Sequence, residues 1–171
     1  MNIQDHIRIV PDFPKAGINF YDISTLLKNP QAWRETITKL ERLMEDYNPD
    51  MLIGIESRGF LVASALAYEM NIGFGMVRKP GKLPGNTLSH GYSLEYGEDT
   101  VEIQPDMLAA GSRVVVVDDL LATGGTMHAA ETLVQKTGAH VVGHVAIIEL
   151  EGLNGTQKLS APFKSLLKLP A

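Results

Sequence analysis

Two adjacent carboxylates, Asp118 and Asp119, precede a run of small residues, Ala122-Thr123-Gly124-Gly125-Thr126. Small residues let the backbone approach a ligand closely, and free N–H groups at a helix start attract anions. Carboxylates accept hydrogen bonds from hydroxyl groups, while backbone donors hold phosphate. Acids beside an anion-binding loop therefore point to a sugar phosphate as the ligand.

Buried elements must position this stretch. Val114 to Val117 are four consecutive valines, typical of a strand buried on both faces in a parallel sheet. Met127 to Thr137 is expected to be a helix that ends at Gly138, and Val141 to Leu150 another buried strand. The acids would then stand at the carboxyl end of a central strand.

The same order of strand, small loop and helix occurs earlier. Met51–Ile55 reads as a buried strand, Glu56-Ser57-Arg58-Gly59 as its loop, and Phe60 to Met70 as a helix. Open α/β sheets bind ligands at this end of their strands, which favours a ligand role for Arg58. An ion pair between Glu56 and Arg58 at a helix start explains the same residues, and both interpretations stay open.

The fold class follows from strands that alternate with helices. A third strand is expected over Gly73 to Val77, an edge strand over Ser165 to Leu169, and a helix that starts at Asn29-Pro30. The sequence therefore predicts an α/β fold with a doubly wound, mainly parallel sheet. Residues 1–171 would form a single domain.

Two segments do not fit the sheet. Residues 78–91 hold three basic residues, two prolines and three glycines, which favours a flexible lid over an anionic substrate. A hairpin is predicted from Tyr92–Tyr96 and Thr100–Ile103, so the lid spans about 78–103. At the N-terminus, a first helix is expected within residues 1–10. The aromatic, Pro-containing stretch 11–23 then forms a small hood (about 1–30), either pinned to the core or stacking on a flat ligand.

Bulk properties exclude several classes. The net charge of −5 argues against nucleic acid as the main partner. No apolar run approaches the about 18 residues of a membrane span, and the N-terminus lacks a signal peptide. The chain has no cysteine, which permits a cytoplasmic location.

Rival motifs fail on spacing. Gly124-Gly125-Thr126 lacks the lysine of a nucleoside-triphosphate loop, and no Gly-x-Gly-x-x-Gly is present. Receiver domains also carry paired acids, but they place them on an early strand, whereas Asp118 and Asp119 follow a long inserted loop. Asp118 and Asp119 start on opposite faces of a strand, which weakens a shared metal ion. No protein metal site is expected.

Residues 114–126 resemble the phosphoribosyl pyrophosphate signature of the type I phosphoribosyltransferases. Within that family, the adenine-specific branch is similar in four further segments: Phe13–Ile23, Gly54–Phe60, Arg78–Gly85 and Tyr92–Gly97. The resemblance covers nearly the whole chain in order. It implies transfer of a 5-phosphoribosyl group from phosphoribosyl pyrophosphate to N9 of adenine, giving AMP and pyrophosphate in purine salvage.

The resemblance also implies roles for individual residues. Asp118 and Asp119 face the ribose, and Ala122, Thr123, Gly124, Gly125 and Thr126 bind the 5′-phosphate. Pyrophosphate is bound by basic and small residues, namely Ser57, Arg58, Arg78, Lys79 and Lys82. Adenine lies among Asn19, Phe20, Tyr21 and Leu121, with Phe20 and Leu121 on its two faces. Glu95, which by pattern alone is a solvent-facing strand residue, becomes the acid that handles the proton at the base.

Mg²⁺ is expected to arrive with the substrate, and the enzyme to be a homodimer whose partners are adenine, phosphoribosyl pyrophosphate, AMP and pyrophosphate. The chain departs from the family pattern at two positions, and each departure weakens one contact that the resemblance implies. Tyr21 and Pro80 stand where some relatives carry basic residues. A phosphoribosyltransferase for another purine stays open as an alternative. So does a non-catalytic purine-sensing module of the same fold, although the sequence leaves no segment for a helix-turn-helix.

Overall fold

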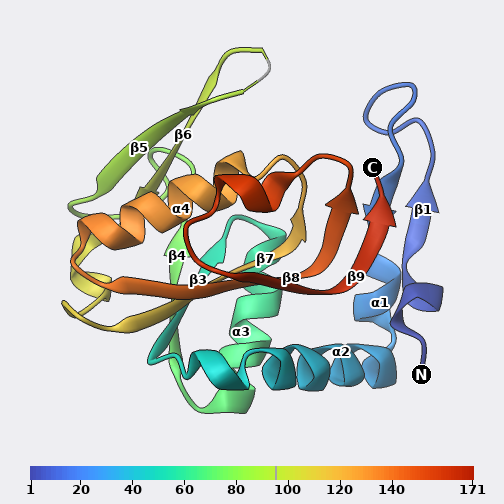
Figure 1. Cartoon of the computed structure of the whole chain (residues 1–171), viewed down its shortest axis with the longest axis horizontal. Helices are drawn as coiled ribbons and strands as arrows, with labels where there is room; N and C mark the ends of the chain where they lie inside the picture. Colours follow the sequence, from blue (N-terminus) through green and yellow to red (C-terminus); the bar gives the residue numbers. More distant parts are fainter. Residues whose placement is uncertain (95) are drawn as a thin grey trace.

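A five-stranded parallel sheet forms the centre of the computed structural model, which describes residues 1–94 and 96–171 (Figure 1). Its strands lie in the order β4 (Gly73–Val77), β3 (Met51–Ile55), β7 (Arg113–Leu121), β8 (His140–Glu151) and β9 (Phe163–Pro170). All four pairings are parallel. The predicted doubly wound sheet is confirmed, and β9 is the expected edge strand.

Helices cover both faces of the sheet. α2 (Pro30–Leu43) and α3 (Arg58–Met70) share a core with Val115 and Val117 of β7. α4 (Gly125–Lys136) packs on the opposite face, against Val114 and Val116. Because side chains alternate along a strand, the four valines serve both cores, which explains why the run shows no polar position.

The helix starts follow local chemistry. The Asn29 side chain accepts hydrogen bonds from the amides of Gln31 and Ala32, both at 3.1 Å, so α2 begins where predicted. α3 begins at Arg58 rather than at the predicted Phe60. α4 begins at Gly125, because Gly124 takes a φ of +88° that turns the chain directly from the loop into the helix.

The N-terminal segment is a small hairpin beside the sheet. A 3₁₀ turn (Ile3–His6) leads into β1 (Arg8–Val10), which pairs antiparallel with β2 (Phe20–Asp22); α1 (Ser24–Lys28) follows. The expected helix within residues 1–10 is therefore wrong beyond its first turn. Pairing of Arg8 with Asp22, in the ladder and through an ion pair, favours the strand instead.

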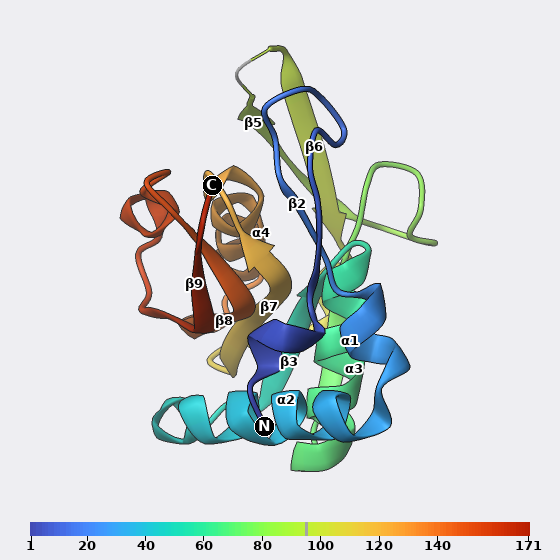
Figure 2. The same ribbon diagram turned by 90° about the vertical axis from the view of Figure 1, so that its right-hand side faces the viewer.

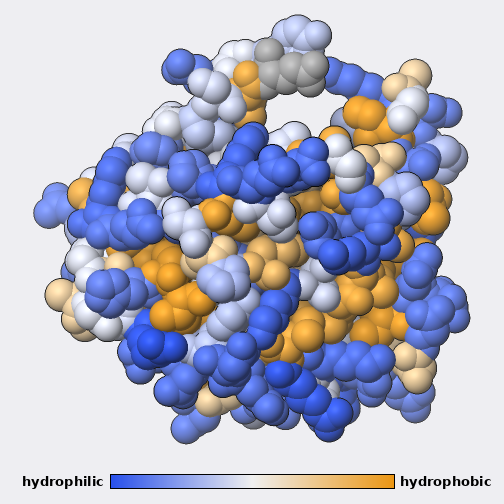
Figure 3. Space-filling model, in the orientation of Figure 1, coloured by the Kyte–Doolittle hydropathy of each residue, from blue (hydrophilic) through white to orange (hydrophobic). Residues whose placement is uncertain are grey.

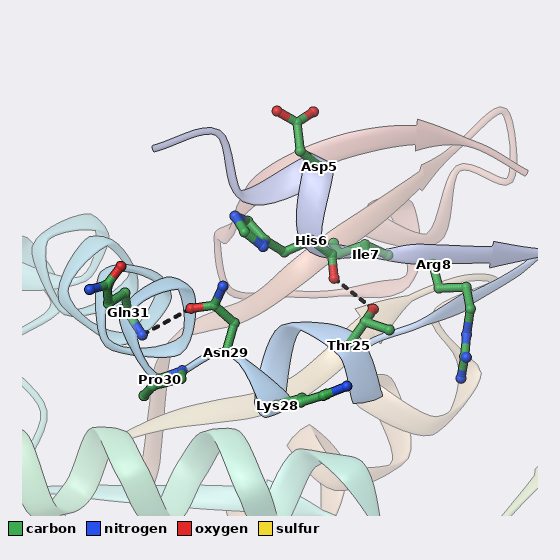
Figure 4. A pocket seen from close by; sticks show the side chains of 9 residues that line it. All are labelled: Asp5, His6, Ile7, Arg8, Thr25, Lys28, Asn29, Pro30 and Gln31. Carbon is green, nitrogen blue, oxygen red and sulfur yellow. Dashed lines mark hydrogen bonds between the residues drawn. The ribbon is translucent and has the colours of Figure 1, made fainter.

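A hydrogen bond within the hood joins α1 to the first turn of the chain. Thr25 donates its hydroxyl to the His6 carbonyl at 2.7 Å (Figure 4). A shallow groove of about 650 Å³ lies there, between the first strand and the start of α2. This groove lies away from the carboxyl ends of the strands, where open α/β sheets bind ligands.

An arm of two strands rises from the sheet (Figures 1 and 2). β5 (Leu88–Ser93) pairs antiparallel with β6 (Glu98–Ile103), which confirms the predicted hairpin, although its first strand lies earlier than expected. Glu102 fastens the basic segment that precedes the arm. Its carboxylate accepts from the Gly81 amide at 2.8 Å and from the hydroxyls of Thr87 and Ser89 at 2.8 and 2.9 Å.

The described residues contain three further 3₁₀ turns: Glu45–Tyr47, Pro105–Met107 and Gly155–Lys158. None of the helices in the described ranges combines the length and apolar character that a membrane crossing requires.

Candidate active site

The carboxyl ends of β3, β4 and β7 open into a cavity of about 460 Å³, beneath the arm. Figure 3 shows an opening between the arm and the hood. In-register pairing of β3 and β7 brings Gly54 opposite Val117, so the loops that follow both strands meet there. The polar groups that line the cavity come from all three strands and from the arm, and include Glu56, Ser57, Arg58, Lys79, Tyr92, Asp99, Asp118, Asp119 and Thr126.

Two acids stand at the floor of this cavity. Asp119 is only 5% exposed, and its Oδ2 accepts from Nε of Arg58 at 2.6 Å. Asp118 lies on the other side of the strand, where its Oδ1 accepts from the Asp119 amide at 2.8 Å. Burial and the neighbouring negative charge of Asp119 raise the pKa of Asp118 well above its ordinary value. The site thus holds a carboxylate with a cationic partner beside a carboxyl that resists ionisation.

The loop between β7 and α4 encloses a smaller cavity of about 100 Å³, lined by residues 120–127 and Asp118. Its backbone amides lie at the N-terminus of α4, where partial positive charge favours an anion. The Tyr92 ring covers Gly125 from the arm, and the Tyr92 hydroxyl lies 2.9 Å from Thr126 Oγ1. A small anion cradle therefore opens next to the two acids.

Basic residues surround the main cavity in ion pairs. Nε of Arg78 donates to Glu56 at 2.7 Å, and Lys79 pairs with Asp99 of β6. The ion pair between Glu56 and Arg58 that the sequence allowed is not formed, because each residue has a different partner. Lys82 is exposed on the segment before the arm. Arg58, Arg78 and Lys79 therefore place three cations around this cavity. Such an arrangement is suited to a polyanionic ligand.

An aromatic cavity of about 420 Å³ adjoins the first, under the hood. Phe13 and Phe20 meet edge to face, with ring centroids 5.2 Å apart and an interplanar angle of 81°. The Arg58 guanidinium lies 5.2 Å from the Phe20 ring centroid, and Arg58 lines both cavities. A flat ring could stack here within reach of the acids and the anion cradle.

The arrangement has a close counterpart among known proteins. The family model for the phosphoribosyl transferase domain matches residues 22–170. The adenine phosphoribosyltransferase of Rhodospirillum rubrum is 57% identical over 167 residues, covering 98% of both chains. The chain belongs to the adenine phosphoribosyltransferase family.

Solved structures of this family share the fold. The adenine phosphoribosyltransferase of Thermoanaerobacter pseudethanolicus superposes with a TM-score of 0.95, at 46% identity and 98% coverage of each chain. That of Trypanosoma brucei, solved with AMP, pyrophosphate and ribose-5-phosphate, reaches 0.87 at 29% identity, covering 97% of this chain and 78% of its own.

Most residues expected at the site of an adenine phosphoribosyltransferase lie together. The cavity at the strand ends gathers Ser57, Arg58, Lys79 and both aspartates, and the small cavity gathers residues 122–126. Phe20 lies in the aromatic cavity. Arg78 stands at the rim through Glu56, whereas Lys82 and Asn19 are exposed outside these linings. Glu95 lies outside the described residues.

Two expected adenine contacts face the protein interior. Leu121 is 2% exposed and packs in the core beneath α4, whereas its neighbour Leu120 lines the main cavity. The Tyr21 hydroxyl donates to the Pro170 carbonyl at 2.5 Å, so the Tyr21 side chain ties the hood to β9. Burial also raises the pKa of Tyr21. Only the backbone of Tyr21 remains available to a ligand.

The arm contributes cavity residues that the sequence did not single out. Tyr92 and Asp99 face each other across β5 and β6, with the tyrosine hydroxyl donating at 3.3 Å. The alternating pattern of β5 and β6 indicates which residues share a face of the arm. It does not indicate which face meets the cavity, because that depends on where the arm leaves the sheet.

Proposed function

We propose that this cavity system is where the chain transfers the 5-phosphoribosyl group from phosphoribosyl pyrophosphate to adenine, forming AMP and pyrophosphate in purine salvage. The observation that carries the assignment is that Arg58 lines both the cavity of the acid pair and the aromatic cavity, while the anion cradle shares Asp118 and Thr126 with the first of these. In the reaction a bond forms between N9 and C1′, the bond from C1′ to the pyrophosphate oxygen breaks, and N9 loses its proton.

The β7 loop holds the sugar phosphate in this proposal. Asp118 and Asp119 accept hydrogen bonds from the ribose hydroxyls, and the negative charge of Asp119 favours the cationic ribose that develops as the leaving group departs. The amides of Ala122 to Thr126 and the two threonine hydroxyls bind the 5′-phosphate. Support comes from the α4 N-terminus and from the 100 Å³ cavity, which fits one phosphate-sized group.

Pyrophosphate is assigned to the opposite wall of the cavity. Arg58 and Lys79 line that wall with Ser57, while Arg78 and Lys82 approach from the segment before the arm. Mg²⁺ supplies charge neutralisation for the leaving pyrophosphate when it is bound. The hard carboxylate oxygens of Glu56 would fit this ion through water, while the substrate provides most of its ligands.

Adenine stacks on Phe20 in this proposal, and backbone groups near Asn19 and Tyr21 read its edge. Leu120 replaces Leu121 as the residue on the opposite ring face, because Leu120 is the leucine that lines the cavity. Glu95 takes the role of the acid that handles the N9 proton. The hood (about 1–30) and the arm with its preceding segment (about 78–103) close over the site and exclude water.

We also propose that the enzyme is a cytoplasmic homodimer. Leu61 and Tyr68 on α3 and Met76 on the edge strand β4 are exposed apolar side chains that offer a surface to a second copy.

The reaction is tested by product formation with a panel of bases. With phosphoribosyl pyrophosphate and Mg²⁺, adenine is expected to give AMP, whereas hypoxanthine, guanine and xanthine give at least about 100-fold lower kcat/KM. Chromatographic detection of nucleotide and pyrophosphate measures both products. Equal use of another purine would reassign the base, and binding of AMP without turnover of any base would favour a sensing module.

Phe20→Ala is expected to raise KM for adenine about tenfold, since a stacked ring contributes roughly 1–1.5 kcal/mol. KM for phosphoribosyl pyrophosphate should change less than about twofold, because the phosphate cradles are built from other loops. Steady-state kinetics with each substrate varied in turn measures both constants. Arg34→Ala, at an exposed position of α2 outside the cavities and outside the proposed dimer surface, is the control. An unchanged KM for adenine would remove Phe20 from the base pocket.

A further inference from the structure

The short turn Gly155–Lys158 lies directly behind the 5′-phosphate cradle. Gly155 is buried, and a Cβ added to it would lie 2.4 Å from the Ala122 carbonyl oxygen and 3.2 Å from the Gly124 amide nitrogen. The contact is reciprocal, since a Cβ on Gly124 would lie 2.3 Å from the Gly155 carbonyl oxygen. Real Cβ atoms do not approach so closely, so two backbones touch here with no room for a side chain on either.

A buried hydrogen-bonded cluster holds the segment after this turn in place. Glu131 of α4 is 1% exposed and His144 of β8 is fully buried, and the His144 Nε2 is hydrogen-bonded to the Glu131 carboxylate. The Glu131 carboxylate also accepts from the Ser160 amide at 3.0 Å, and the His144 amide donates to the Pro162 carbonyl at 2.8 Å. The segment that begins at Gly155 is thus tied to the helix that carries the cradle and to the neighbouring strand.

Glu131 has no contact with the cavities and no evident need for burial in an apolar core. Its pairing with His144 and Ser160 lowers its pKa to about 2, so it stays charged throughout the working range of pH. Burying this charge costs desolvation free energy. A more specific folded structure is one gain that offsets such a cost.

We propose that Gly155 is a positioning residue for the 5′-phosphate loop, held against that loop by the Glu131–His144–Ser160 cluster. The backbone of Gly155 fixes the carbonyl of Ala122 and the turn at Gly124, so the cradle's amides stay directed at the phosphate before substrate arrives. The inference rests on the proposed function, in which residues 122–126 bind phosphate.

Gly155→Ala is expected to raise KM for phosphoribosyl pyrophosphate about tenfold or more, and to weaken AMP binding by a similar factor. KM for adenine and the affinity for adenosine, which lacks the phosphate, should change less than about twofold. Gly73→Ala is the matched control, because the added methyl group at that exposed position meets no atom within 4 Å. An unchanged KM for phosphoribosyl pyrophosphate in folded Gly155→Ala would overturn the proposal.

Glu131→Gln provides a second variant if Gly155→Ala does not fold. It keeps an acceptor for Ser160 but loses the charge that holds His144, so KM for phosphoribosyl pyrophosphate should rise by about threefold, with adenosine affinity unchanged. An equal loss of affinity for phosphoribosyl pyrophosphate, AMP and adenosine would indicate a merely structural role and would contradict the proposal.

Amide NMR of the unmodified protein separates this inference from the function on which it rests. The Gly124 and Gly125 amide signals should shift with AMP but not with adenosine. If they do not move, residues 122–126 do not bind phosphate and the proposed function fails. If they move and Gly155→Ala retains its AMP affinity, only the positioning role fails.

Discussion

Asp119→Asn is expected to lower kcat by about 10²–10³-fold, because the neutral amide cannot stabilise the positive charge that develops on the ribose. Stability should fall by only about 1 kcal/mol, since asparagine has the same shape and its oxygen still accepts from Arg58, 2.6 Å away. Single-turnover kinetics and urea denaturation measure the two effects on the same sample.

Asp46→Asn is the appropriate control for this change. Asp46 also pairs with a cation, Lys164, at 2.6 Å, but on the surface away from the cavities. Its loss should leave kcat unchanged. A kcat for Asp119→Asn within about twofold of the unmodified enzyme would refute the ribose role.

Arg58→Ala is the second change with a large expected effect. Because Arg58 lines both cavities, its loss should raise KM for phosphoribosyl pyrophosphate about 100-fold and KM for adenine by a few-fold. It also leaves Asp119 unpaired while only 5% exposed, which should cost about 1–3 kcal/mol of stability. Initial-rate kinetics with each substrate, together with thermal unfolding, measure these effects.

The double variant Arg58→Ala/Asp119→Asn shows whether the two residues act together. Since they share one hydrogen bond, the combined stability loss should be smaller than the sum of the single losses. Arg34→Ala, an exposed arginine on α2, should change neither constant. Additive effects in the double variant would mean that the pair does not couple in solution.

The sheet was predictable because its strands are short, apolar and bounded by clear signals. Three of these signals depend only on neighbours in the sequence, which is why local chemistry predicts them. They are the valine run of β7, the Asn29-Pro30 start of α2 and Gly138 after α4. The β1 strand was missed because Arg8 to Val10 gain their strand partners only from Phe20 to Asp22, a pairing that the local pattern does not reveal.

The candidate site residues also differ in whether their neighbours in the sequence predict their position. Residues next to a strand end, such as Arg58 and Asp119, were placed by their position in the sequence alone. Which of Leu120 and Leu121 lines the main cavity depends on the direction of each side chain where β7 leaves the sheet, and that direction depends on packing against α4 and Gly155. The close contact of Gly155 with Ala122 and Gly124 joins segments more than 30 residues apart, where no local signal exists.

Arg58 gives the two halves of the site a shared wall, and this has a thermodynamic consequence. A ligand that draws its guanidinium away from Asp119 changes the surface that the other cavity presents over Phe20. Linkage then requires that the two substrates alter each other's affinity by the same factor, whichever binds first. Adenine and phosphoribosyl pyrophosphate should therefore bind as a coupled pair, with a cooperativity that vanishes when Arg58 is removed.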